Sequence, residues 1–426
     1  MQPWVYWKFL EQPDFGPGPS VHTILFMTDL NVESVSTLGK WFNSEDAWKT
    51  LMAGGNQTDF RVGPLATYAF SPHFSPGLQH RLKLDVKAQE YPPGVLLLPL
   101  TSSTLKPFSK TNLVVFSSKV PVEQDALSRL QGEALIVDPG CHPSEAQELL
   151  SKIVKSLPKK LFVFLTHHHL DHTEGLPTVY KENPEALVLA HELTIRRLGK
   201  VQGKLKCLPV VDGASVLIGN EELRVIAAPG HTDGHMALLH VPSHTLIVGD
   251  HCVGQGSSRL DAAGGGNMQD YLSTTRNFIG LAPRVIVPMH GQINLWPLQM
   301  LRGYIRYREA REAKILSSIN QGARTAFQVV SQAYSDTPPA LWIAALSNAK
   351  LHVDHLNQLQ QLPLDFSKAL FQKSCGVGFF LRCLSYSSFR MLKAVPQSHH
   401  GVWKVPIAIA VLGCVVFVDK MICHKS

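Results

Sequence analysis

The sequence has no closely spaced cysteine pair, no marked excess of charge and no cysteine pattern typical of a secreted disulfide-bonded protein. Its seven cysteines include no C-x-x-C pair, which excludes a thiolate zinc knuckle and a redox dithiol. Scattered cysteines in 426 residues fit a reducing compartment better than a disulfide framework, so we expect an intracellular protein of the cytosol or an organelle matrix. The net charge of +7 is mild and far below that of domains that bind nucleic acids through basic patches.

A long apolar run is also missing. Residues 405–418 are 14 apolar or small residues, whereas a membrane-spanning helix needs about 20. Trp403-Lys404 and Asp419-Lys420 flank the run. We therefore expect a buried segment or one that contacts a membrane at its interface, and a C-terminal membrane anchor is the alternative. The first 15 residues lack the basic and then apolar pattern of a signal peptide.

The pattern along the chain indicates four regions. Residues 1–105 combine short apolar runs with frequent Gly and Pro, which is typical of a small α+β module. Residues 106–296 alternate strand-like runs with helical stretches, which predicts a layered α/β domain. Residues 297–370 look helical, with Arg and Glu spaced for an exposed helix face. Residues 371–426 form a tail that contains the apolar run.

The layered region shows its elements clearly. The strand-like runs are residues 113–116, 134–137, 161–165, 186–189, 223–226, 246–248 and 285–287. Between the second and third run, apolar residues recur at helical spacing from Ala146 to Leu157, which predicts an amphipathic helix. Ser144 and Gln147 are spaced for a capping box at its start.

Histidine is the abundant residue, with 20 copies. Four histidines and one aspartate fall within His167–His172, directly after the apolar run that ends at Leu165. Other acidic and histidine residues also follow strand-like runs, namely Asp138, His231, His235, Asp250 and His290. Because loops converge at the carboxyl ends of strands in layered α/β folds, we expect these side chains to meet there.

These residue types favour a metal site over a solvated histidine-rich loop, since a chance loop would have to explain five clusters at once. Imidazole and carboxylate are zinc ligands. Residues two apart in an extended segment share a face, so His167 and His169 can bind one ion. Asp171 and His172 can bind a second, and Asp250 can bridge the two. Paired metals polarise a substrate oxygen and ionise a shared water.

The segment H-H-H-L-D-H resembles the H-x-H-x-D-H motif of the metallo-β-lactamase superfamily. The segments D-P-G, P-G-H-T-D-G-H, G-D and the late His-Gly match its other motifs in order. The resemblance implies an αββα sandwich that binds two Zn²⁺ ions per chain. The ligands it implies are His167, His169 and His231 for one ion, Asp171, His172 and His290 for the other, and Asp250 as the bridge.

The same resemblance implies roles within the site. A hydroxide held between the metals is the expected nucleophile, oriented by Asp171, and His290 is counted with Asp171 as catalytic. Asp138 is expected to support the ligands from outside. His231 occupies the family's ligand position, so we assign His235 to the same supporting layer. We expect His168 to be a rim or packing residue.

The segments T-N-L-V-V-F and G-D-H-C-V-G-Q-G-S-S resemble one branch of the superfamily more closely. That branch carries a winged-helix-like C-terminal domain and is associated with endoribonuclease activity on single-stranded RNA. Plant members have an N-terminal extension reminiscent of a Nudix domain, although residues 1–105 contain no Nudix box. Two alternatives stay open: a glyoxalase II-type hydrolase of small thioesters or lactones, and a non-enzymatic protein with a residual metal site. The oligomeric state is not indicated.

Three departures from the family pattern stand out. Glu174 replaces Gly in D-H-x-G-G, so we expect an altered turn after His172. Met289 replaces the first Gly of the usual P-G-H-G, next to His290. No clear wing follows Leu359, so we expect a truncated C-terminal domain.

Overall fold

The computed structural model describes residues 5–12, 21–27, 89–90, 94–104, 106, 108–118, 132–199, 204–254 and 256–394. The chain forms two compact units, which are described separately. The first extends to Ile305 without residues 259–263 and 267–269. The second consists of those two short segments and the chain from Arg306 onward.

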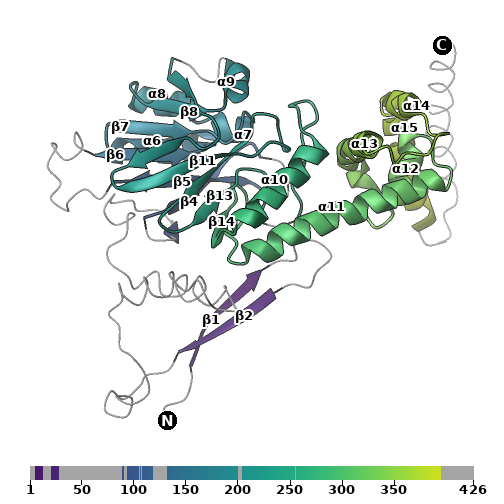
Figure 1. Ribbon diagram of the computed structural model, residues 1–426, viewed down its shortest axis with the longest axis horizontal. Coiled ribbons are helices and arrows are strands. Elements are labelled where there is room, and N and C mark those ends of the chain that lie inside the picture. Colours follow the sequence, from purple (N-terminus) through teal and green to yellow (C-terminus); the bar gives the residue numbers. More distant parts are fainter. Residues whose placement is uncertain are drawn as a thin grey trace, which may run out of the picture. The chain divides into compact units, whose positions relative to one another are not determined.

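The first unit contains a seven-stranded sheet of mixed direction (Figure 1). Its order follows the chain: β3 (Gln89–Glu90), β4 (Leu96–Thr101), β5 (Lys110–Ser117), β6 (Glu133–Val137), β7 (Lys160–Phe164), β8 (Leu187–Ala190) and β9 (Lys206–Pro209). Strands β3 to β6 pair antiparallel, and β6 to β9 pair parallel. Since β3 and β4 belong to it, this sheet begins before residue 106, where the sequence placed the start of the layered domain.

A second sheet of five strands completes the β layers. Its order is β10 (Ser215–Ile218), β11 (Glu221–Ala227), β12 (Met236–His240), β13 (Thr245–Ile247) and β14 (Val285–Val287). All pairs are antiparallel except the last, β13 with β14. Strands β1 (Val5–Gln12) and β2 (Val21–Met27) form a separate antiparallel pair.

Helices of the first unit connect these strands. They are α6 (Ser144–Ser156), α7 (Leu170–Thr173), α8 (Leu176–Glu182), α9 (Glu192–Leu198) and α10 (Met268–Leu281). The amphipathic helix predicted after residue 137 is present as α6. The predicted capping box is wrong, because Pro143 is the N-cap and no side chain caps the helix. Helix α6 starts directly after this proline.

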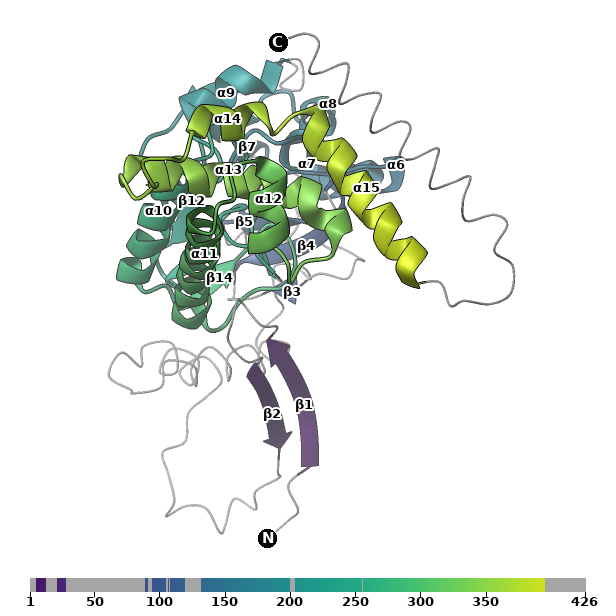
Figure 2. The same ribbon diagram turned by 90° about the vertical axis from the view of Figure 1, so that its right-hand side faces the viewer.

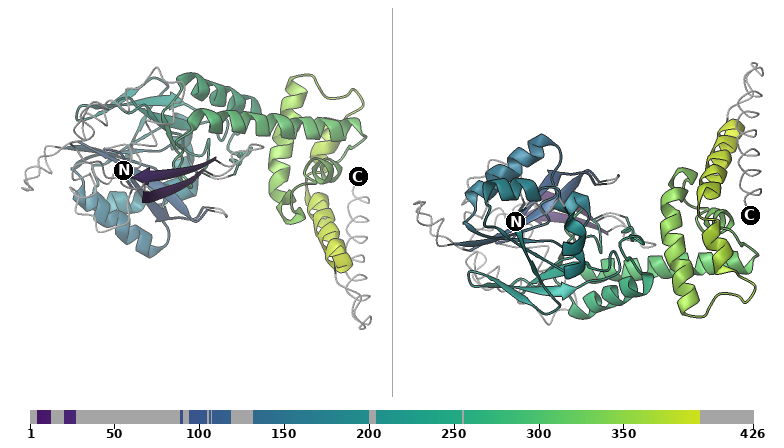
Figure 3. Two further views of the ribbon diagram at one scale, coloured as in Figure 1. Left: turned by 90° about the horizontal axis from the view of Figure 1, so that it is seen from below. Right: turned by 90° about the horizontal axis from the view of Figure 1, so that it is seen from above.

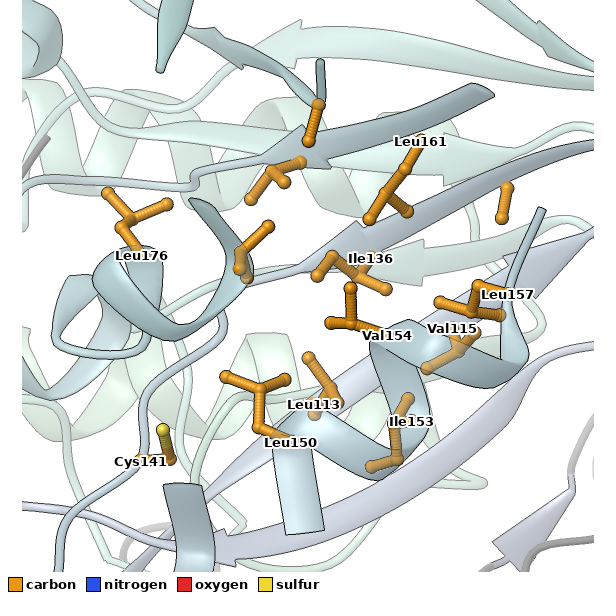
Figure 4. Packing of buried hydrophobic residues seen from close by; sticks show 14 of the residues in the cluster. Leu113, Val115, Ile136, Cys141, Leu150, Ile153, Val154, Leu157, Leu161 and Leu176 are labelled. Atoms are coloured by element: carbon orange, nitrogen blue, oxygen red, sulfur yellow. The ribbon is translucent and has the colours of Figure 1, made fainter. Parts of the chain in front are cut away.

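Two hydrophobic cores lie on opposite faces of the seven-stranded sheet. Leu113 and Val115 of β5 pack with Leu150 and Ile153 of α6 (Figure 4). The alternate residues of β5, such as Val114, belong to the cluster shared with the five-stranded sheet. This alternation follows from the two-residue period of a strand. The layered arrangement confirms the predicted metallo-β-lactamase-type α/β sandwich.

The second unit is helical over its described residues (Figure 2 and Figure 3). It contains the C-terminal part of α11 (Pro297–Asn320), then α12 (Ala326–Ala333), the 3₁₀ helix η3 (Pro339–Leu341), α13 (Trp342–Gln358), α14 (Lys368–Lys373) and α15 (Val377–Ala394). Its own core includes Ile315, Val330, Trp342, Leu356 and Phe371. The helical C-terminal segment is confirmed. Residues 306–394 include no strand, and the winged-helix likeness stays a prediction.

The exposed face that the spacing of Arg and Glu predicted on α11 is present only in part. Arg302, Arg306 and Glu309 are exposed as predicted. Arg308 and Arg311 are buried. Arg311 donates a hydrogen bond to Asp336 at 3.0 Å and lies over the Tyr334 ring, 4.2 Å from its centroid. Glu312 accepts hydrogen bonds from the histidines of α13, His352 at 3.0 Å and His355 at 2.8 Å. At Arg311 and Glu312 the prediction of a solvated face is wrong, because their partners come from the turn after α12 and from α13.

None of the helices in the described ranges is both long and apolar enough to cross a membrane. The apolar run at 405–418 lies outside those ranges, so membrane contact through it stays a prediction.

Candidate metal centre

The acidic and histidine residues predicted to meet do come from loops at one edge of the two sheets. Asp138 directly follows β6, and His167 to His172 follow β7. His231 lies between β11 and β12, while Asp250 and His290 follow the parallel strands β13 and β14. Because β6 and β7 are also parallel, their carboxyl ends face the same edge.

The first cluster joins His167, His169, His231 and Asp250, whose ligand atoms all lie within 4.8 Å of one another. His167 Nε2 is 2.9 Å from His169 Nδ1, and His231 Nε2 is 3.2 Å from the same atom. Asp250 Oδ2 lies 4.0 Å from His231 Nε2. These are the residues that the resemblance assigned to one ion, together with the bridging aspartate.

The second cluster joins Asp171, His172 and His290, also within 4.8 Å. His290 Nε2 lies 3.3 Å from Asp171 Oδ2. Asp250 Oδ1 lies 3.4 Å from His290 Nε2 and 3.5 Å from His172 Nε2. One oxygen of Asp250 therefore faces each cluster, an arrangement that suits a bridging carboxylate.

The donor atoms fit divalent cations. His172 Nε2 and Asp250 Oδ1 are buried and make no hydrogen bond. A buried polar atom without a partner costs on the order of 1–3 kcal/mol, so such atoms are expected to have a further ligand. A set of imidazole nitrogens and carboxylate oxygens suits a borderline cation such as zinc. Binding by these residues stays a prediction.

Electrostatics divide the histidines into two kinds. Burial and the neighbouring His172 lower the pKa of His167 well below its ordinary value, so its imidazole is neutral and ready to bind a cation. Burial also acts against charge on His290, but Asp250 outweighs it and raises the pKa of His290 to about 10. The pKa of His172 likewise lies well above its ordinary value despite burial, because of Asp250 and Asp171. Without a cation, the second cluster therefore holds protons.

The carboxylates respond in the opposite direction. Burial alone would raise the pKa of Asp171, but the charges of His172 and His290 bring it down to about 2. Asp250 is buried as well, and the same two histidines hold its pKa well below the ordinary value. Both carboxylates are thus ionised throughout the physiological range.

Asp138 orients the second cluster from outside. Its Oδ1 accepts a hydrogen bond from the backbone N–H of Thr166 at 2.8 Å, and its Oδ2 accepts from the Thr166 hydroxyl at 2.6 Å. His172 Nδ1 also donates to Oδ2, at 2.9 Å. His290 Nδ1 donates to the carbonyl of Lys110 at 2.9 Å. These bonds leave Nε2 of both histidines directed at the cluster.

His235 contacts the bridging aspartate through the backbone. Its buried Nε2 accepts a hydrogen bond from the Asp250 N–H at 3.1 Å. Gly249, which has a φ of +56°, packs so closely that a Cβ there would be 2.4 Å from His235 Nε2. His235 therefore packs against the backbone of residues 249 and 250, and its role in supporting a metal site stays a prediction. His168 belongs to neither of the two clusters described above.

Sequence reasoning missed Thr104 and Phe108. The Thr104 hydroxyl lies 3.5 Å from His290 Nε2, and the Phe108 ring stacks on the His290 ring with centroids 5.6 Å apart. Both residues precede β5, which runs antiparallel to β6. The start of β5 therefore lies at the edge where β6 ends, and this pairing is the signal that would have found them.

Met289 does not disturb His290. Its side chain is fully buried in the core between the sheets. Its carbonyl accepts a hydrogen bond from the Asn112 N–H at 2.7 Å, and its own N–H donates to the Gly249 carbonyl at 3.2 Å. The residue thus fills core space and holds the loop through its backbone.

Comparison with known proteins identifies the family that the central part of the chain resembles. Residues 127–290 match the metallo-beta-lactamase superfamily. The chain is 28% identical to a beta-lactamase-like protein 2 homolog of Caenorhabditis elegans over 45% of this chain and 62% of the relative. It is 26% identical to the Drosophila melanogaster homolog, over 46% and 68%. A lactamase-like protein nscB of Trichophyton verrucosum is 29% identical, over 45% and 67%.

The match covers less than half of this chain and under two thirds of the nematode relative. Among solved structures, a metallo-beta-lactamase family protein from Thermus thermophilus superposes with a TM-score of 0.51 at 20% identity, over 63% of this chain and 94% of the other. A beta-lactamase domain protein from Burkholderia ambifaria also gives 0.51, at 19% identity, over 64% and 90%. At such identity the likeness shows the fold alone.

Proposed function

The chain carries a metallo-beta-lactamase superfamily domain, and from this premise we propose that it is a dinuclear zinc hydrolase that cleaves single-stranded RNA. The observation that carries the proposal is Asp250, whose two oxygens face two separate donor clusters. Similarity to beta-lactamase-like protein 2 homologs supports the RNA substrate, since that branch is associated with endoribonuclease activity.

In the proposed site, two sets of residues would each hold one zinc ion. His167, His169 and His231 would hold one ion, and Asp171, His172 and His290 the other. Bound zinc would polarise a phosphoryl oxygen and lower the pKa of a water molecule.

The chain's own residues supply position and charge. Asp171 is partly exposed, with 19% of its side chain accessible, and stays ionised because its pKa is about 2. It can therefore accept a hydrogen bond from an attacking water and orient it. The Lys110 carbonyl accepts a hydrogen bond from His290 Nδ1 and so orients the ring, whose Nε2 lies 3.3 Å from Asp171 Oδ2.

A paired assay tests the substrate. The zinc-loaded full chain is incubated with labelled single-stranded RNA and with S-lactoylglutathione. We expect RNA cleavage that Asp171→Ala abolishes and that Asp270→Ala, a change of an exposed aspartate in α10, leaves intact.

Each other outcome selects an alternative. Cleavage of the thioester alone, lost in Asp171→Ala, would replace the nuclease with a glyoxalase II-type hydrolase. Fewer than one metal ion per chain in clean protein, with neither substrate cleaved, would favour a residual site without enzymatic function.

A further inference from the structure

Glu174 occupies a position where glycine is not needed. It ends α7 with φ −63° and ψ −16°, which is ordinary right-handed helix geometry open to any residue. The next residue, Gly175, is the constrained one, because a Cβ there would lie 2.0 Å from the Pro139 carbonyl oxygen. The turn after His172 therefore places no glycine requirement on position 174, and the side chain of Glu174 makes another contact.

That contact is with Ser103, which is 71 positions away in the sequence. Glu174 Oε1 accepts a hydrogen bond from the Ser103 backbone N–H at 2.9 Å. Its Oε2 accepts one from the Ser103 hydroxyl. Two bonds from one carboxylate fix both the position and the orientation of Ser103. Ser103 lies in the loop between β4 and β5, of which residues 102–104, 106, 108 and 109 are described.

The β4–β5 loop reaches the second donor cluster. Its two ends are joined by a hydrogen bond from the Ser102 N–H to the Ser109 carbonyl at 3.2 Å. Thr104, next to Ser103, places its hydroxyl 3.5 Å from His290 Nε2. Phe108 covers one face of the His290 ring. Any shift of Ser103 therefore moves Thr104 relative to His290.

A solvent-exposed carboxylate–serine contact of this kind contributes little to folding stability, because water competes for both partners in the unfolded chain. The contact can still affect the reaction rate, because it lies beside the second donor cluster. A displacement of about 1 Å at a reacting centre can cost ~100-fold in rate.

We propose that Glu174 is a positioning residue, which holds the β4–β5 loop through Ser103 so that Thr104 and Phe108 form a substrate-contacting wall beside His290. The Thr104 hydroxyl is placed to donate to a substrate oxygen. The expected effect on kinetics rests on the proposed hydrolase function. The contact between Glu174 and the loop does not depend on that function.

Hydrogen exchange tests the contact without any activity. In Glu174→Ala we expect the peptide that covers residues 102–109 to exchange several-fold faster than in the wild type. Glu174→Gln restores most of the protection, because its amide oxygen still accepts from the Ser103 N–H. The control is Glu182→Ala, which removes a carboxylate–serine bond, Ser151 to Glu182 at 2.9 Å, together with an ion pair to Lys155, and which should leave exchange of the β4–β5 loop unchanged. Unchanged exchange in Glu174→Ala overturns the proposal.

Kinetics test the wall. With the substrate that the wild type cleaves, we expect Glu174→Ala to lower kcat/KM by ~10-fold, mostly through KM, while zinc content stays at the wild-type level. Ser103→Ala keeps the backbone bond and should show a smaller loss, and it also serves if Glu174→Ala fails to fold. If the loop exchanges faster in Glu174→Ala but kcat/KM is unchanged, the proposal that Thr104 and Phe108 contact the substrate is refuted. A wild type that cleaves neither substrate refutes the proposed function, while exchange still decides whether Glu174 holds the loop.

Discussion

At the scale of single residues, Asp138 joins two parts of the site. One carboxylate serves three donors: the N–H and hydroxyl of Thr166, and Nδ1 of His172. An amide at this position has only one acceptor atom, so Asp138→Asn would turn an NH₂ group toward a donor. We expect its zinc affinity to fall by about 10- to 100-fold, as is typical when such supporting partners are changed.

Competition with a chromophoric chelator measures that loss. The control is Asp212→Asn, whose Oδ1 accepts from the Ala227 N–H at 2.8 Å and which keeps that acceptor as an amide oxygen. Equal affinity in Asp138→Asn and wild type would show that Asp138 has no part in holding His172.

The donor residues could be predicted from the sequence because each lies in a local motif at a strand end. His167 and His169 are two apart, and the remaining donors follow other strand-like runs. Thr104 could not be found this way, because its place beside His290 depends on the antiparallel pairing of β5 with β6. The sequence shows Glu174 only as a departure from the family's D-H-x-G-G pattern. Its contact with Ser103 is apparent only in the folded structure.

At the scale of elements, close backbone packing sets the position of Asp171. Gly140, just after β6, lies so near this residue that a Cβ would be 1.6 Å from the Asp171 carbonyl oxygen. We expect Gly140→Ala to lower the free energy of unfolding by ~3 kcal/mol, because the backbone must shift, and to reduce zinc content by displacing Asp171.

Chemical denaturation and metal analysis check this prediction together. Gly280→Ala is the matched control, because nothing lies within 4 Å of a Cβ at this α10 residue. Alanine in a helix should raise stability there by up to about 1 kcal/mol. A Gly140→Ala protein with wild-type stability would contradict the close approach.

The strand-like runs of residues 106–296 mark real strands, since their period and apolar content are local properties. The run at 161–165 became β7 and that at 223–226 lies in β11. The sequence could not assign these runs to one sheet or the other, because both sheets bury the same residue types. It also could not show that Arg311 is buried, since its partner Asp336 comes from a later segment.

At the scale of the whole molecule, the proposed zinc site links loops that are far apart along the chain. Its donors extend from His167 to His290, so the complete set exists only in the folded first unit. A ligand that binds the folded state alone stabilises it by about 2.7 kcal/mol at 100 times its Kd. In the zinc-free protein, however, His172 and His290 hold protons that zinc must displace.

The stabilisation by zinc should therefore depend on pH with a defined sign. The pKa of His290 is about 10, so His290 stays protonated between pH 6 and 8 without metal, and the pKa of His172 is raised in the same direction. Each displaced proton makes zinc binding about tenfold weaker per unit of falling pH. We expect zinc to raise Tm by roughly 5–10 °C at pH 8 and by clearly less at pH 6. Thermal unfolding of the full chain with zinc or with EDTA measures this, and Asp171→Ala is the variant in which the difference should shrink. A zinc effect that is equal at both pH values would mean that no protons leave these histidines on binding.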